Sequence, residues 1–152
     1  MNSRFTMATH ILAMLAHAEN EKRGPVTSEK MAESIQTNAV VVRRLLSELA
    51  GAGLVASKRG AGGGVALAKS PRNISLLDVY VAVEEKDALF GRHPSGPNPS
   101  CPIGPLVAAY LEGVFGRARS ALEESLREVT LAQMFEDLSR RADRRPQRKA
   151  RG

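Results

Sequence analysis

The sequence predicts a mainly α-helical fold with one small β-hairpin and a long helix in the second half of the chain. Three observations support this prediction. Apolar residues recur at helical spacing through most of the 152 residues. The stretch SKRGAGGGV at 57–65 places four glycines beside two positive charges, as expected of a hairpin with a pliable, cationic tip. A second apolar stripe at helical spacing runs from Ile103 to Val129.

The first two helices follow from periodicity and capping signals. Residues 4–19 carry an amphipathic pattern, and the Gly-Pro pair at 24–25 should end this first helix. Thr27 or Ser28 can cap a short second helix that reaches about Ser34. On the first helix, His10 could face a partner, but an ordinary surface or satisfied histidine on an apolar helix is the favoured alternative.

A third helix is expected after the turn at Gln36-Thr37, with Asn38 as its N-cap. Its apolar positions have the spacing of a buried stripe: Val42, Leu45, Leu46 and Leu49. The opposite face displays Val40, Arg43, Arg44 and Ser47. This helix therefore combines a buried side with a side that offers two guanidinium groups.

The glycine-rich stretch lies between two short runs, 54–59 and 65–68, that read as the strands of the hairpin. Nucleotide-binding loops fit it poorly. The spacing Gly60-x-Gly62 is followed three residues later by Val65, so no dinucleotide fingerprint is completed. The next lysine downstream, Lys69, follows Ala68, so no Walker loop is formed either.

Helix, short helix, turn, longer helix and β-hairpin in this order is the plan of a winged helix-turn-helix. In this fold the second helix of the motif enters the major groove of DNA. The wing would then hold Lys58 and Arg59 against the phosphate backbone or a narrow minor groove. The alternative is a winged-helix module that contacts or senses a protein and does not bind DNA specifically.

The second half of the chain predicts a brace, a loop and two more helices. Ser75 and Asp78 approximate a capping box for a short bracing helix. Five of the eight prolines fall at 93–105, which favours a linker or sensing loop. The long stripe that follows exceeds what its own domain can cover, so it needs a partner, most simply the same helix of a second subunit. A last helix, capped by Thr130, is expected to pack back onto that pair.

The net charge of +6 is unevenly distributed. Residues 140–152 alone carry +6, residues 1–83 carry +4 and residues 84–139 carry −4. The basic half coincides with the predicted winged domain, and the final segment is expected to be a disordered, solvated tail. No secretory signal and no apolar run of about 20 residues is present, which favours the cytoplasm and no membrane contact.

Catalytic and metal-binding patterns are not evident in the sequence. No carboxylate pair or Ser/His/Asp grouping stands out, so an enzyme is not expected. The single cysteine, Cys101, excludes an intrachain disulfide framework and a zinc site built from several cysteines of one chain.

Two motifs carry a family resemblance. The first is Leu49-x-x-x-Gly53-Leu54-Val55-x-Ser57-x-Arg59-Gly60-x-Gly62-Gly63-Gly64-x-x-Leu67-Ala68, and the second is Ile74-Ser75-Leu76-Leu77-Asp78-Val79-Tyr80-x-Ala82-Val83 after Pro71. They resemble the Rrf-two (Rrf2) family of bacterial winged-helix transcription regulators, which includes iron-sulfur and nitric-oxide responsive repressors. The resemblance implies a homodimeric repressor with a long dimerisation helix beyond the wing and, in several members, a sensing loop before that helix.

Cys101 departs from this family pattern, because cluster-binding members supply three nearby cysteines and this chain supplies one. An iron-sulfur cluster would need the partner's Cys101 and residues such as His10 or His93, so no cofactor or metal is expected. Cys101 precedes a predicted helix N-terminus, where a thiol pKa is lowered, so it could be an oxidisable sensor or form an intersubunit disulfide. A cysteine without a regulatory role remains the alternative.

The expected organisation is a winged helix-turn-helix DNA-binding domain at 1–84, a proline- and glycine-rich loop at 85–104, dimerisation helices at 105–139 and a basic tail at 140–152. The expected function is a sequence-specific, homodimeric repressor that binds a palindromic operator in double-stranded DNA. Its predicted DNA-binding residues are Ser28, Thr37, Asn38, Val40, Arg43, Arg44, Lys58 and Arg59.

Overall fold

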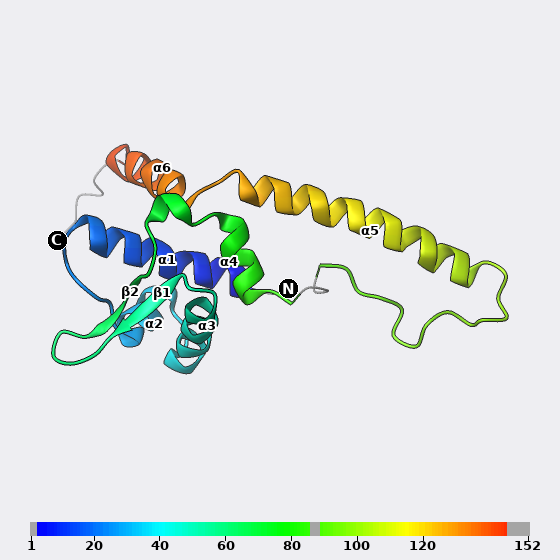
Figure 1. Cartoon of the computed structure of the whole chain (residues 1–152), viewed down its shortest axis with the longest axis horizontal. Helices are drawn as coiled ribbons and strands as arrows, with labels where there is room; N and C mark the ends of the chain where they lie inside the picture. The colour runs from blue at the N-terminus through cyan, green and yellow to red at the C-terminus, as the bar shows by residue number, and fades with distance from the viewer. Residues whose placement is uncertain (1–2, 86–88, 146–152) are drawn as a thin grey trace, which may run out of the picture.

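The computed structural model describes residues 3–85 and 89–145 (Figure 1). The elements follow in the order α1 (Arg4–Asn20), α2 (Ser28–Ile35), α3 (Ala39–Gly51), β1 (Val55–Lys58), β2 (Gly64–Leu67), the 3-10 turn η1 (Pro71–Asn73), α4 (Leu76–Val83), α5 (Gly104–Arg127) and α6 (Leu131–Asp143). The predicted fold class is confirmed: helices dominate the described residues, and two antiparallel strands form the wing.

Side-chain caps set where four of the helices begin. Thr27 accepts a hydrogen bond from the Lys30 backbone N–H at the start of α2, and Asn38 accepts one from Val40 at the start of α3. Ser75 and Thr130 each form a full capping box, at α4 and α6. These bonds satisfy N–H groups that the first helical turn leaves without a partner, so the chain turns into each helix at the predicted residue.

The wing is fixed by backbone pairing at both of its strands. Val55 pairs with Leu67 and Lys58 with Gly64, so the tip spans residues 59–63. Val26, just before α2, adds a bridge to Val65 through two backbone hydrogen bonds of 2.8 and 2.9 Å. Strand β2 of the wing is therefore tied to the segment before α2, and β1 contacts α3.

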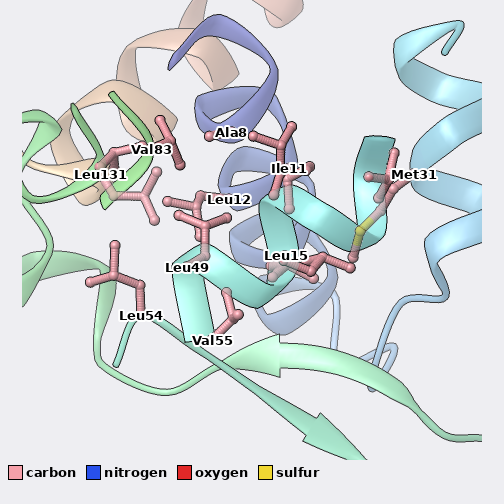
Figure 2. Packing of buried hydrophobic residues seen from close by; sticks show 14 of the residues in the cluster. Ala8, Ile11, Leu12, Leu15, Met31, Leu49, Leu54, Val55, Val83 and Leu131 are labelled. Carbon is pink, nitrogen blue, oxygen red and sulfur yellow. The ribbon is translucent and has the colours of Figure 1, made fainter. Parts of the chain in front are cut away.

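Helix α1 lies at the centre of the winged domain and contacts α2, α3, α4, α6 and β2. Figure 2 shows Ile11, Leu12 and Leu15 of α1 meeting Leu49 of α3 and Met31 of α2. Each of these five side chains is almost completely shielded from solvent. Burial of this apolar surface stabilises the packing that sets the angle between α2 and α3.

Helix α6 packs on the winged domain, which differs from the prediction that it packs onto a pair of long helices. Leu131 at its start is buried in the same core, and Phe135 lies 6.1 Å, centroid to centroid, from His17 of α1. Two backbone bonds explain this placement: Leu131 N–H donates to Ile74 O at 2.8 Å, and Leu76 N–H donates to Val129 O at 2.9 Å. They hold the α5–α6 junction against the chain between η1 and α4.

Helix α5 projects away from the rest of the molecule, and residues 89–103 run outward beneath it to its N-terminal end (Figure 1). It covers 24 residues and none of them is buried. Its N-terminal half exposes five large apolar side chains, counting the cap residue: Ile103, Leu106, Val107, Tyr110 and Leu111. The N-terminal half of the predicted stripe is therefore exposed in the single chain, whereas Phe115, Leu122 and Leu126 in its C-terminal half are half-buried.

The last helix extends into the segment assigned to a basic tail, because α6 continues to Asp143. Arg140 supports this extension through an ion pair with Glu136, one turn earlier, at 2.6 Å. Residues 146–152 of the expected tail lie outside the described part of the chain. Among the described residues, no helix has the length and apolar character needed to cross a membrane.

Candidate nucleic-acid interface

Helix α3 presents its polar face because its apolar face is held in the core. Val42, Leu45 and Leu49 are buried to within 1% of full shielding. Leu46 lies on the same buried side, so at 3.6 residues per turn the positions on the opposite side of the helix point outward. The predicted contact residues on this helix, Val40, Arg43 and Arg44, are all exposed. The helix thus offers an uncovered surface of the width that enters a major groove.

A cleft of about 650 Å³ lies between the start of α2, the exposed face of α3 and the wing. It brings together three of the predicted site residues, Ser28, Arg43 and Lys58. Hydroxyl groups dominate the rest of its polar lining, from Thr27, Ser47 and Ser57. Hydroxyls and cations are the side chains that bind phosphate oxygens, so the cleft has the chemistry of a nucleic-acid backbone site.

The other predicted residues occupy different positions around this cleft. Asn38 Oδ1 accepts a hydrogen bond from Val40 N–H at 2.7 Å, so its carbonyl oxygen is used as the helix cap. Thr37 is half-buried, and its backbone N–H donates to Ala32 O at 3.0 Å. Arg59 is exposed at the tip of the wing, outside the cleft. These residues frame the surface from its two ends.

The two arginines of α3 differ in their ion pairs. Arg43 Nη2 donates to Glu29 Oε1 of α2 at 2.9 Å. Arg44 Nε lies 3.8 Å from Glu48 Oε1, one turn along α3, and its side chain is 76% exposed. Glu48 also pairs with Arg4 of α1. Arg44 is therefore held loosely, whereas Arg43 is held by a neighbouring helix.

Glu29 is one of the residues of this surface that sequence reasoning missed. In the sequence it is an acidic residue in the first turn of α2, which the helix dipole favours without further explanation. Its distance to Arg43 depends on the angle between α2 and α3, and no local pattern encodes that angle. Ser57 was missed for a similar reason, because its place in the cleft depends on the register of the wing.

Cys101 precedes the N-terminal end of α5 by three residues, and this end of the helix points away from the winged domain (Figure 1). Its Sγ accepts a hydrogen bond from the Gly104 backbone N–H at 3.3 Å. The backbone N–H groups of Gly104 and then Ile103 lower the pKa of the Cys101 thiol below its usual value. The thiol faces a second pocket, of about 650 Å³, that His93, Val107 and Phe115 also line.

Metal-binding groups do not gather around this thiol. Within the described ranges, no three His, Cys, Asp or Glu side chains lie together in a way that could hold a metal ion. Iron-sulfur clusters take several thiolates, and the chain has one cysteine. The donor set of a single chain does not fit such a cluster. His10, the other candidate ligand, lies on α1 with its Nε2 3.0 Å from Ser34 Oγ.

Comparisons with known proteins agree with this geometry. The model of the Rrf2 family, described as an iron-dependent transcriptional regulator, matches residues 1–137. YwnA of Bacillus subtilis, named an HTH-type transcriptional regulator, is 38% identical over 138 residues, which cover 91% of this chain and 98% of YwnA. The IscR regulator of Cronobacter sakazakii is 39% identical over 75 residues, which cover 49% of this chain and 46% of IscR.

Solved structures share the whole arrangement. The structure of T. potens IscR superposes with a TM-score of 0.70 at 26% identity and covers 97% of this chain and 92% of its own. That of CymR, described as the global cysteine regulator of B. subtilis, has the same fold, with a TM-score of 0.66 at 24% identity over 90% of this chain and 95% of its own. From the motifs, the winged-helix geometry and the match over residues 1–137, this chain belongs to the Rrf2 family and is a DNA-binding transcriptional regulator, not an enzyme.

Proposed function

We propose that two copies of this protein pair and repress transcription by binding one palindromic operator. The observation that supports this proposal most directly is the cleft that joins Arg43 of α3 to Lys58 of the wing. A helix in the major groove and a wing on the adjacent backbone contact the same duplex only when they face the same side. The work of a repressor requires access to the bacterial chromosome, so we also propose a cytoplasmic location.

The pairing proposal rests on α5. Its exposed apolar side chains include Tyr110 at 74% and Leu106 at 66% exposure. An apolar stripe of this length on one helix is stabilised by a partner helix that covers it. A two-fold axis through paired α5 helices would place the two α3 helices at separate half-sites, about one turn of DNA apart. The operator would then be palindromic.

Within each copy, the residues divide into base readers and backbone contacts. Arg43 is the principal base reader, because a guanidinium can bind O6 and N7 of guanine together. Arg44, Asn38 and Val40 complete the surface of α3 that faces the groove. Lys58, Arg59, Ser28 and Thr37 would bind the phosphate backbone, and the two cations would supply a salt-dependent part of the affinity.

A mutant pair tests this division of labour. Arg43→Ala should cost about 1 to 3 kcal/mol on the operator and relax one base position, whereas Lys58→Ala should weaken all sequences alike and lower the salt slope by about 1. The measurement is fluorescence anisotropy with duplexes from the DNA upstream of the protein's own gene, with single-base variants and with a scrambled duplex. Equal losses on operator and scrambled DNA for both variants would refute the assignment.

Cys101 is proposed as an oxidisable sensor, in a protein that works without a bound cluster. Its lowered pKa increases the thiolate fraction, and the thiolate is the form that peroxide oxidises to a sulfenic acid with release of water. Mobility shift of the operator should change after peroxide treatment of the wild type and not of Cys101→Ser. An identical response in the two proteins would exclude this role.

A further inference from the structure

The ion pair between Arg43 and Glu29 connects the proposed base reader to a second helix. Arg43 Nη2 donates to Glu29 Oε1 at 2.9 Å, and the two side chains remain 57% and 67% exposed. The pair lies in the cleft between α2, α3 and the wing. Neither side chain fills the core, and both lie in the cleft that DNA would approach.

Glu29 is held at its other oxygen as well. Ser28 Oγ donates to Glu29 Oε2 at 3.2 Å, and Thr27 caps the same helical turn. A backbone N–H and then the Arg43 guanidinium lower the pKa of Glu29, so the carboxylate is charged at neutral pH. Its position is fixed from α2, which is packed on the core through Met31.

A carboxylate in this cleft lowers the affinity for DNA, so its presence there calls for another role in recognition. Among the described residues that line the cleft, Glu29 is the one acidic side chain, and Arg43 and Lys58 are the cations. Its charge repels phosphates and weakens attraction to every sequence alike. Its bond to Arg43 occupies one of the five N–H donors of the guanidinium, which leaves the others for a base.

We infer that Glu29 is a positioning and specificity-determining residue, which holds the Arg43 guanidinium for guanine and keeps it from the phosphates. The inference rests on the proposed role of Arg43 as a base reader. Without Glu29, the Arg43 side chain is free to rotate to a phosphate oxygen. Such a contact raises affinity for any sequence and carries no base information. The carboxylate therefore trades affinity for selectivity.

The experiment combines Glu29→Gln, Arg43→Ala and the double variant, with Glu33→Gln as the matched control. Glu33 is exposed one turn further along α2, and it forms no ion pair within the described part of the chain. The control therefore removes the same charge from the same helix. Dissociation constants are measured at fixed salt on the operator, on its single-base variants and on a scrambled duplex, and thermal melting confirms that each variant is folded.

Glu29→Gln should lower the ratio of operator to scrambled affinity by about two- to fivefold, the range expected of an exposed ion pair. The loss should arise mainly from tighter binding to the scrambled duplex and should fall on the base position that Arg43 reads. Glu33→Gln should leave this ratio unchanged. In the Arg43→Ala background, Glu29→Gln should have no further effect on base preference, because the group that it positions is gone.

The outcomes separate this inference from the function on which it rests. If Arg43→Ala leaves base preference unchanged, the proposed base reader is wrong. If Arg43→Ala relaxes one position and Glu29→Gln does not, Arg43 reads a base and the positioning role of Glu29 is overturned. If Glu29→Gln alters base preference equally with and without Arg43, Glu29 contacts a base itself, for instance cytosine N4, and the inference is likewise overturned.

Discussion

Replacement of Gly64 by alanine should displace the wing from the winged domain. Gly64 begins β2 with a φ of +153°, a conformation that L side chains rarely adopt. A Cβ built there would lie 2.5 Å from Val26 O and 2.7 Å from Val26 C, which are backbone atoms. The bridge between Val26 and Val65, with its bonds of 2.8 and 2.9 Å, stands beside this contact and would have to open.

The expected cost follows from these two terms. Backbone strain of this kind costs about 1 to 3 kcal/mol, and each lost backbone hydrogen bond costs about 0.5 to 1.5 kcal/mol. With both bonds of the Val26–Val65 bridge lost, the free energy of unfolding should therefore fall by about 2 to 6 kcal/mol. Because the wing also carries Lys58, binding to every duplex should weaken together with stability.

Gly62→Ala is the matched control for this prediction. Gly62 also has a positive φ, +74°, but an added Cβ there meets no atom within 4 Å. Its cost should be about 1 to 2 kcal/mol, from backbone conformation alone. Urea unfolding of both variants measures the difference, and anisotropy measures DNA affinity. Equal destabilisation by the two substitutions would refute the argument that the Val26 contact, and not glycine flexibility, determines residue 64.

Four further outcomes are expected. Leu131 is fully shielded in the core, so Leu131→Ala should lower the free energy of unfolding by about 2 to 5 kcal/mol, measured by urea unfolding; a loss below 1 kcal/mol would contradict the packing of α6 on the winged domain. Leu111→Asp should yield a monomer by light scattering, since a carboxylate on the exposed stripe of α5 cannot be buried unpaired in a pair of helices; an unchanged mass would exclude pairing through this face. The lowered pKa of Cys101 means that its alkylation rate should reach half-maximum at a lower pH in the folded protein than in urea; coincident profiles would contradict the hydrogen bond from Gly104. Asn38→Ala should lower stability by about 1 kcal/mol, as loss of an N-cap does, with calorimetry as the measurement.

Local chemistry explains why much of the fold could be predicted. The N-caps at Asn38, Ser75 and Thr130 are bonds between residues at most three apart, so the starts of α3, α4 and α6 follow from short patterns. The glycine tip and its flanking apolar runs likewise predict a hairpin, whose strands are confirmed at Val55–Lys58 and Gly64–Leu67.

The features that the sequence does not predict depend on contacts between residues far apart in the chain. The docking of α6 on α1 follows from the bond between Leu131 and Ile74, which lie far apart in the sequence, and the stripe of α6 alone does not indicate its partner. The Glu29–Arg43 pair depends on the angle between two helices, which core side chains such as Met31 determine. Periodicity identifies the face of α3 that is exposed, but not the neighbour that reaches it.

The backbone bonds at Val129 and Leu131 give α5 a rigid mount at one end. If two copies pair along this helix, the number of residues between the bonds at Val129 and Leu131 and the paired stripe sets the direction in which each DNA-reading surface faces around the helix axis. One residue inserted there would turn that surface by about 100° and take the two half-sites off a common face of the duplex. Seven inserted residues would leave an offset of only about 20°. The length of α5 would therefore set the rotation of each DNA-reading surface about the helix axis as well as the distance between the two half-sites.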